Sequence, residues 1–440
     1  MLVSKFYFAQ DYTISGYISE NKSGESLIGA TIFDLNSKKG TVANEYGFFS
    51  ITLPKDSVLL KISFVGYKTD VKKIFLDGNK TFNIELMDSD LLEEVVILGE
   101  DSEGIQEKSS MSTINLSMSK VKALPVLLGE VDVVKTLQLL PGVQSGSEGG
   151  SGMYVRGGGP DQNLILLDGV PIYNASHLFG FFSVFNADAI NSVKLIKGGF
   201  PAQYGGRLSS VIDIRMKEGN MKEFHGEGSI GILSSKLMLE GPLIKDKTSF
   251  AISGRRTYID VLAYPFIKAA GDGEVAGYFF QDLNAKINHK FSNKSKLYLS
   301  SYFGKDKFYS KYEDESVYEN KKNLYKDKAR LEWGNRIAAL RWNYQLSPKL
   351  FSNITATYSR YKFLIASESE SESLDLVTGE KNFDEYSLEY KSGIRDFSIK
   401  SDFDYAVHPD HYVKFGGNYT YHTFTPGINQ ETESSNNNSS

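Results

Sequence analysis

Apolar and polar residues alternate with a period of two along four segments in the second half of the 440-residue chain. A period of two exposes one face of an extended strand to an apolar environment and the other face to a polar one. These segments are 283–291, 339–346, 397–405 and 413–422. Looser candidates are 224–239, 249–258, 296–303 and 354–363. We therefore expect about eight long antiparallel strands after residue 221.

The amino-acid composition agrees with a β-protein but does not show whether its strands face water or lipid. The 26 Tyr, 28 Phe and 40 Gly against 11 Pro favour strands and turns over helices. The absence of Cys excludes disulfides and Cys-ligated metals. A net charge of −5 provides no basic field for nucleic acid. Since no run of about 18 apolar residues occurs, a closed barrel is the way in which this chain could span a bilayer.

Strand length and turn chemistry favour a membrane barrel over a soluble sandwich. The predicted strands have about 10 residues or more, as tilted membrane strands do, and aromatic residues crowd their ends. The connections 305–328 and 368–385 are long and charged, as is typical of extracellular loops. In contrast, 292–294 and 347–349 are tight, as is typical of periplasmic turns.

The first 112 residues divide into three parts. Phe6-Tyr7-Phe8-Ala9-Gln10 indicates that residues 1–11 are the remnant of a signal peptide whose start lies upstream. Residues 12–87 contain five short strand candidates separated by turn clusters, which predicts a small Ig- or transthyretin-like β-sandwich. Residues 88–112 are acidic, then apolar, then polar, and we interpret them as a linker.

Residues 113–220 form a second predicted unit, of α+β type. Apolar positions between 130 and 140 have helical spacing, and Pro141-Gly142 ends that helix. Asp168-Gly169 is a hairpin turn signal between two short apolar runs. Glycine doublets punctuate the segment from 154 to 214 and allow tight turns in a compact domain.

This glycine-punctuated segment resembles the plug domain of TonB-dependent outer-membrane transporters. Three motifs carry the resemblance, in the family's order: YVRGG at 154–158, DQNLILLDGVP at 161–171, and 190–198 followed by AQYGG at 202–206. The matching residues are Arg156, Gly157, Gly158, Asp168, Gly169, Pro171, Gly205 and Gly206. Arg156 could pair with a carboxylate on a barrel wall, or be an ordinary surface arginine.

The flanking segments carry related resemblances. Sequence segments such as ISGYI and ISFVGYK in residues 12–87 resemble the carboxypeptidase regulatory-like domain that precedes plugs in Bacteroidetes-type transporters. This resemblance does not imply peptidase activity. The β-prone run in the linker resembles a TonB box, a strand handed to TonB by strand addition. That run comprises Leu92, Glu93, Glu94, Val95, Val96, Ile97 and Leu98.

The resemblance implies a mainly β architecture: an N-terminal sandwich, a small α+β plug and, in residues 221–440, the first strands of a large antiparallel transmembrane β-barrel. A plugged lumen belongs to barrels of about 22 strands, so we expect further strands beyond residue 440. It also implies an outer-membrane receptor that imports a scarce solute with TonB and its inner-membrane energising complex. The solute, such as a siderophore, oligosaccharide or peptide, would bind at loops and plug tips. Candidate contacts are Ser147, Gly152, Asn174 and His177.

Other functions receive less support from the sequence. A non-transporting surface receptor or adhesin is the alternative that the same domains allow. No nucleophile elbow or Ser/His/Asp arrangement is visible, and the glycine-rich loop has no Gly-Lys-Ser/Thr ending, so we expect no enzyme and no nucleotide site. No cofactor or metal ion is expected, and outer-membrane lipids are the surrounding partners. We interpret His408 and His411 as turn residues.

Overall fold

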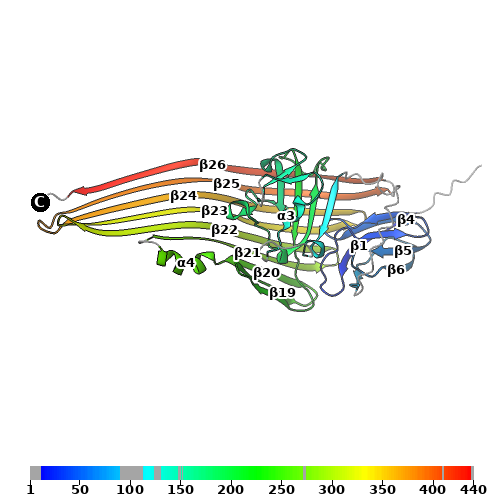
Figure 1. Ribbon diagram of the computed structural model, residues 1–440. Coiled ribbons are helices and arrows are strands. Elements are labelled where there is room, and N and C mark those ends of the chain that lie inside the picture. The colour runs from blue at the N-terminus through cyan, green and yellow to red at the C-terminus, as the bar shows by residue number, and fades with distance from the viewer. Residues whose placement is uncertain are drawn as a thin grey trace, which may run out of the picture.

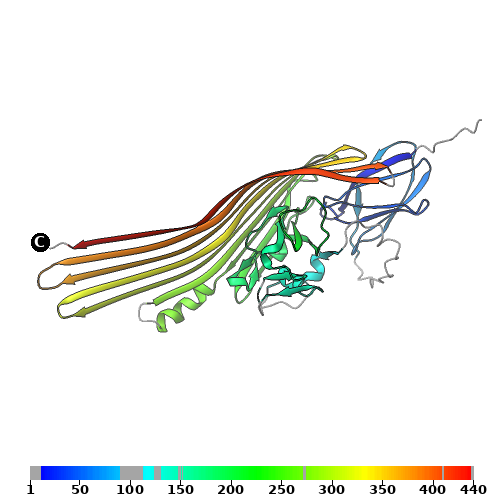
Figure 2. The ribbon, with the colours of Figure 1, turned by 90° about the horizontal axis from the view of Figure 1, so that it is seen from above.

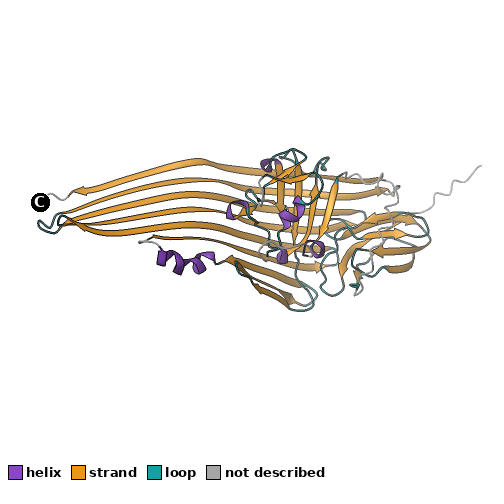
Figure 3. Ribbon diagram, in the orientation of Figure 1, coloured by secondary structure: helices purple, strands orange, loops and turns teal. Residues whose placement is uncertain are grey.

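The computed structural model describes residues 11–89, 112–122, 130–146, 150, 152–270, 274–408 and 411–437. A long sheet runs the length of the molecule, and a small α+β body, the plug, lies against one of its faces (Figure 1). The N-terminal sandwich lies at one end of the sheet, and the strands run far past the plug at the other end (Figure 2). The sandwich and the long sheet consist mainly of strands, whereas the plug combines short strands with helices and loops (Figure 3).

The sandwich consists of two four-stranded sheets. One contains β1 (Asp11–Glu20) between β4 (Phe48–Pro54) and the short β7 (Lys80–Thr81), with β8 (Ile84–Leu86) also on β1. The other has the order β3-β2-β5-β6, with bounds Gly40–Val42, Thr31–Asp34, Ser57–Ser63 and Asp70–Phe75. Along β5, Leu60 and Ile62 are fully buried while Lys61 is exposed, so alternation sets the core face.

A five-stranded mixed sheet forms the centre of the plug, in the order β13-β12-β17-β16-β9. The strands are Val170–Pro171, Asn163–Leu167, Ser210–Met216, Ile190–Ile196 and Thr113–Ser117. Smaller elements surround it: α2 (Met118–Lys122), β10 (Val143–Ser145), β11 (Met153–Val155), η1 (Pro160–Gln162), β14 (Ser176–His177), η2 (Leu178–Gly180), β15 (Phe182–Ser183) and η3 (Ala187–Ala189). The apolar runs of β16 and β17 are buried on both faces of this sheet.

Two local predictions in the plug are confirmed by the structure. The helix expected between 130 and 140 is α3 (Val133–Gln138), capped by Asp132, whose side chain accepts the Lys135 N–H at 3.0 Å. Asp168 and Gly169 both have positive φ, 49° and 81°, and connect β12 to β13 as a hairpin turn.

The long sheet contains nine antiparallel strands in chain order, where the sequence predicted about eight. They are β18 (His225–Ile230), β19 (Ser234–Ile244), β20 (Thr248–Thr257), β21 (Glu274–Ser292), β22 (Ser295–Tyr318), β23 (Lys321–Ser347), β24 (Leu350–Asp375), β25 (Lys381–His408) and β26 (His411–Asn437). The single strand predicted at 224–239 is two strands, β18 and β19. The helix α4 (Ile259–Ala270), between β20 and β21, was not predicted. In the described part of the chain, no helix is both long and apolar enough to cross a membrane.

The prediction of long loops at 305–328 and 368–385 is wrong. β22 and β23 stay paired up to Tyr318 and Lys321, and only Glu319 and Asn320, both with positive φ, form the turn. β24 and β25 likewise pair up to Leu374 and Lys381. Charge was read as a sign of loops, but oppositely charged residues facing each other across strands stabilise a ladder.

The candidate functional site: the plug against the sheet wall

The plug is held to the long sheet through polar side chains on one face of the strands. Alternate residues of β21 and β22 point towards the plug, among them Asp282, Lys286 and Asp306, and each is 4% exposed or less. Buried charges are unfavourable unless they are paired and hydrogen-bonded. The partners of these residues are therefore what fixes the plug in place.

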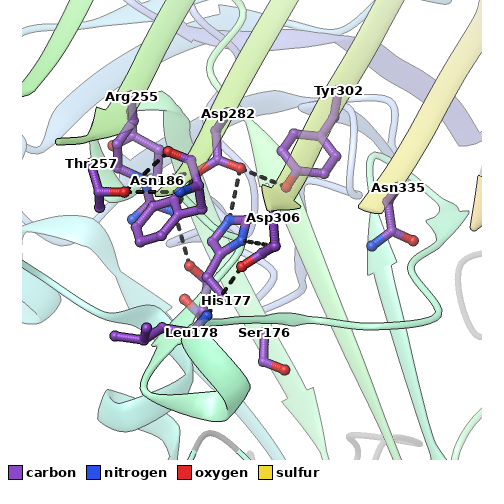
Figure 4. A network of polar contacts seen from close by, with 12 residues as sticks. Ser176, His177, Leu178, Asn186, Arg255, Thr257, Asp282, Tyr302, Asp306 and Asn335 are labelled. Atoms are coloured by element: carbon purple, nitrogen blue, oxygen red, sulfur yellow. Dashed lines mark hydrogen bonds and ion pairs between the residues drawn. The ribbon is translucent and has the colours of Figure 1, made fainter. Parts of the chain in front are cut away.

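His177, at the end of β14, lies between two carboxylates of the wall (Figure 4). Its Nδ1 is 2.6 Å from Asp306 Oδ2, and its Nε2 is 2.8 Å from Asp282 Oδ1. The ring stacks on Phe280 with centroids 4.2 Å apart. The backbone N–H of Leu178 donates to Asp306 Oδ1 at 3.1 Å, so the same carboxylate also holds η2.

Asp282 is the centre of this network. Besides His177, it accepts hydrogen bonds from the Nε of Arg255 at 2.8 Å and from the Tyr302 hydroxyl at 2.7 Å. Arg255 on β20 in turn donates to the carbonyl of Ser183 in the plug at 2.9 Å, and lies 3.7 Å from Glu130. A contiguous set of charged groups thus joins three strands of the wall to three segments of the plug.

The protonation of His177 follows from this setting. Burial acts to lower the pKa of His177, but the carboxylates of Asp282 and Asp306 outweigh it and raise that pKa to about 9. His177 is therefore a cation at neutral pH. A buried imidazolium between two carboxylates is an electrostatic lock rather than a neutral packing group.

We expect plug docking to weaken as the pH rises from about 7 to 10. Because the pKa of His177 is raised from 6.5 to about 9, its contribution is complete below pH 6.5 and is lost as the pH passes 9. The shift corresponds to on the order of 3 kcal/mol. Trp333, whose Nε1 donates to the Ser176 carbonyl at 3.3 Å, provides a fluorescence signal for docking. In His177→Gln the alkaline loss should be absent; an unchanged loss would assign it to another group.

The hairpin tip at Asp168 forms a second attachment to the wall. Lys286 Nζ lies 3.1 Å from Asp168 Oδ2, and Arg341 Nη2 donates to the Asp168 carbonyl at 2.6 Å. Three residues further along the chain, the carbonyl of Pro171 accepts a hydrogen bond from the Ser359 hydroxyl at 2.8 Å. Burial acts to raise the pKa of Asp168, but Lys286 and Arg341 outweigh it, so that pKa lies below its ordinary value.

The segment after the hairpin continues along the wall. Tyr173 donates to Asp396 on β25. The Asn174 carbonyl accepts from the Asn335 side-chain amide at 2.7 Å, while the Asn174 side chain accepts from the N–H and hydroxyl of Ser176. Residues 168–178 are therefore attached to β21 through β25 at successive points.

The sandwich contacts both the plug and the wall. Glu45 is bound by two plug cations, Lys194 at 3.1 Å and Arg215 at 2.9 Å. Phe351 of β24 stacks on Phe48 and Tyr46 of the sandwich, with centroids 4.9 Å and 5.6 Å away. These contacts fix the sandwich at the end of the sheet where the tight turns lie.

A polar cavity of about 450 Å³ lies where the three bodies meet. Its lining includes Tyr46 from the sandwich, Tyr173 and Arg215 from the plug, and Arg341 and Lys400 from the wall. The volume is within the range of small-molecule sites. Cations, carboxylates and aromatic rings are mixed in its lining, which suits a polar solute rather than a lipid.

The predicted plug residues differ in their roles. Asp168, Gly169 and Pro171 belong to the docked hairpin. Gly169 and Pro171 also line the cavity, together with Gly205 and Gly206. Gly157 has φ 86°, and a side chain at Gly158 would meet Ser209 at 2.4 Å, so both positions require glycine. Arg156 is exposed and donates to the Ser112 hydroxyl at 2.8 Å; the expected pairing with a wall carboxylate is not found among the described residues.

Ser147, one of the predicted solute contacts, lies outside the described residues, as does the predicted TonB-box run 92–98. The Gly152 carbonyl accepts from the Gln138 side chain at 3.1 Å. His177 is only 1% exposed, so it lies inside the contact between plug and wall rather than at an open tip. Within the described ranges, no group of three or more His, Asp or Glu is placed to hold a metal ion.

Sequence reasoning missed the wall residues that hold the plug. The alternating pattern predicts that one face of each strand is polar, but it does not show which polar residues contact the plug. Those residues are Asp282, Lys286, Asp306 and Arg341. One signal was available: a charged residue on the face that lines a plugged lumen must have a partner.

Comparisons with known proteins agree with this architecture. The family model described as TonB-dependent Receptor Plug Domain matches residues 107–211, and that for the CarboxypepD_reg-like domain matches residues 14–97. The chain is thus a plugged outer-membrane β-protein. It carries a TonB-dependent receptor plug domain behind a carboxypeptidase regulatory-like domain, and its location is the outer membrane.

Similar curated proteins are receptors and transporters rather than enzymes. TonB-dependent receptor P3 of Formosa agariphila is 27% identical over 38% of this chain and 17% of its own length. Vitamin B12 transporter BtuB of Vibrio vulnificus is 26% identical over 47% of this chain and 34% of its own. The matches therefore span about a third or less of these relatives.

Solved structures show a related but distant likeness. The siderophore receptor PirA of Acinetobacter baumannii has 16% identity and a TM-score of 0.35, over 71% of this chain and 61% of its own. A point mutant of the ferric enterobactin receptor of Pseudomonas aeruginosa has 14% identity and a TM-score of 0.36, over 75% and 60% of the two chains.

Proposed function

We propose that this protein imports a scarce solute across the outer membrane, with the plug as the gate and TonB as the source of energy. The observation that carries the proposal is the attachment of a plug to the polar face of membrane-length strands by buried ion pairs. Such pairs are costly to break one at a time, so the plug remains closed without an external force.

The run Leu92–Leu98 supplies the point at which that force would act. It has high β-propensity and lies in the chain between the sandwich and the plug, where a strand can add to the sheet edge of a partner protein. Main-chain hydrogen bonds would transmit the pull. The domain boundaries that we propose remain those of the sequence: 12–87, 88–112, 113–220 and 221–440.

Deletion of Leu92–Leu98 tests this proposal. Uptake should fall to the level of a strain without the protein, while the amount of protein in the outer membrane is unchanged. A control deletion of seven residues within the polar segment 101–110 should leave uptake intact. If the Leu92–Leu98 deletion retained full uptake, or if only adhesion could be measured, the alternative of a non-transporting receptor or adhesin would replace the transporter.

The solute class is a separate question. The names of the relatives, a vitamin B12 transporter and a siderophore receptor, support a chelate or cobalamin-like compound. The polar cavity is also compatible with an oligosaccharide or a peptide. We propose transport without covalent chemistry and without a cofactor. Growth of a deletion strain on each candidate nutrient separates these classes.

A further inference from the structure

The outward face of the long sheet carries an apolar band. Its exposed side chains include Leu340 and Trp342 on β23, Ile354 on β24, and Phe397 and Ile399 on β25, each at least 36% exposed. In a soluble sheet such a continuous apolar face would be covered. In an outer-membrane protein it is the face that contacts lipid tails.

A row of three arginines borders this band on the side away from the sandwich. Arg336 of β23 is paired in register with Arg360 of β24, and Arg360 is paired with Arg395 of β25. All three are on the outward face, because their neighbours Asn335, Ser359 and Asp396 are buried on the inward face. Side chains directly opposite each other on adjacent strands have Cβ atoms about 5 Å apart.

The height of the row above the tight turns matches one bilayer core. From Ser347 at the end of β23 to Arg336 there are 347 − 336 = 11 residue steps. At about 3.4 Å per step and a tilt near 45°, this gives roughly 26 Å, close to the roughly 25 Å of a membrane-barrel apolar band. The tight turns 292–294 and 347–349, which we expect to be periplasmic, lie at the sandwich end of the sheet. With the transport function proposed above, the row then lies at the head groups of the outer leaflet.

No carboxylate within the described ranges neutralises the row. Like charges directly opposite each other destabilise a sheet. None of the three arginines forms an ion pair with a described carboxylate. Glu332, the outward carboxylate nearest along β23, is already bound by Lys305 at 2.9 Å and Lys307 at 3.4 Å. Arg336 makes a cation–π contact with Phe303, at 5.2 Å, which brings no negative charge to the row. The neighbouring Lys362 is also outward and exposed, and adds a fourth positive charge.

We propose that the row of Arg336, Arg360 and Arg395 is a binding site for the phosphate-bearing head group of an outer-leaflet lipid. Guanidinium groups bind phosphate oxygens in a bidentate manner, and a bound phosphate offsets the repulsion between the three arginines. The apolar band directly below accepts the acyl chains of the same molecule. A free anion would use the guanidinium groups only, whereas a lipid uses both surfaces.

The test is native mass spectrometry of the full-length, detergent-purified and delipidated protein, titrated with phosphorylated lipid A. With about 1 kcal/mol for each basic residue near a membrane surface, the triple variant R336Q/R360Q/R395Q should bind on the order of 100-fold more weakly. Replacing the same three arginines by lysine keeps the charge but removes the bidentate geometry, so binding should lie between that of the unmodified protein and that of the glutamine variant. Lipid A from which the phosphate has been removed should bind the unmodified protein as weakly as phosphorylated lipid A binds the glutamine variant.

A matched control removes three other outward cations. Lys322, Lys328 and Arg330 are paired with Glu315, Glu370 and Glu368, at 2.8, 2.9 and 3.2 Å. K322Q/K328Q/R330Q has the same change in net charge and should bind phosphorylated lipid A as the unmodified protein does. Retention of heat-modifiable migration in each variant shows that it is folded.

Three results would overturn the proposal. The first is equal lipid binding by the glutamine variant and the unmodified protein. The second is equal binding of the phosphorylated and dephosphorylated lipids. The third is displacement of the lipid by millimolar inorganic phosphate, which would make the row a site for free anions. Uptake of solute is not the readout, so failure here is distinguishable from failure of the proposed transport.

Discussion

Asp282→Asn should loosen the plug more than any other single conservative change in the wall. Asp282 is fully buried and accepts from His177, Arg255 and Tyr302. Asparagine keeps the shape but leaves two buried cations with weaker compensation, since His177 retains Asp306 and Arg255 retains Glu130 at 3.7 Å. Breaking a buried ion pair in this way costs about 3–5 kcal/mol.

Hydrogen exchange of the amides in residues 176–185 measures this change. A loss of about 3 kcal/mol accelerates exchange through local opening by on the order of 100-fold. Asp327→Asn, at an exposed position of β23, is the matched control and should leave exchange in the plug unchanged. Equal protection in D282N and the unmodified protein would mean that other contacts hold the plug.

Lys286→Met should release the hairpin tip by a similar amount. Lys286 is 4% exposed and compensates the buried Asp168 carboxylate at 3.1 Å. Without it, the carboxylate loses its ion pair and keeps a hydrogen bond from the Met216 N–H at 3.1 Å. Arg341 donates to the Asp168 backbone carbonyl and acts on the carboxylate only from a greater distance. An unpaired buried charge again costs about 3–5 kcal/mol. Exchange of the amides from 164 to 170 should accelerate accordingly.

A double-mutant cycle separates the ion pair from packing. Asp168→Asn alone should also loosen the hairpin, because Lys286 is then the uncompensated charge. The double variant D168N/K286M contains no buried charge at this pair, and should recover a large part of the loss. Strictly additive effects of the two single variants would show that the two side chains do not interact.

The general architecture was predictable because it rests on local signals. Alternation gave the strands of the long sheet, and the Asp168-Gly169 turn gave the plug hairpin. The predicted ends of the strands were wrong where charged residues take the place of the alternating apolar residues. Lys328 and Glu370 were read as loop residues, yet they pair across β23 and β24 at 2.9 Å. Cross-strand pairing depends on register, which one strand's sequence does not contain.

The contact between plug and wall could not be predicted for a related reason. His177 and Asp282 lie 105 residues apart, and His177 and Asp306 lie 129 apart. Nothing near His177 in the sequence marks it as a cation with two carboxylate partners. The sequence placed it among candidate solute contacts, a role that stays a prediction. Its burial becomes evident only when the wall is present.

The position of β9 determines how the plug responds to mechanical load. Among the described strands, β9 is the outermost of the plug sheet, has five residues, and pairs with β16 alone. A pull on the chain ahead of residue 112 reaches Thr113 before any other strand of the plug. When an edge strand is pulled from one end, its hydrogen bonds break one after another rather than all at once. The plug therefore has a built-in peeling point, and β12, β16 and β17 can stay folded while the first strand unzips.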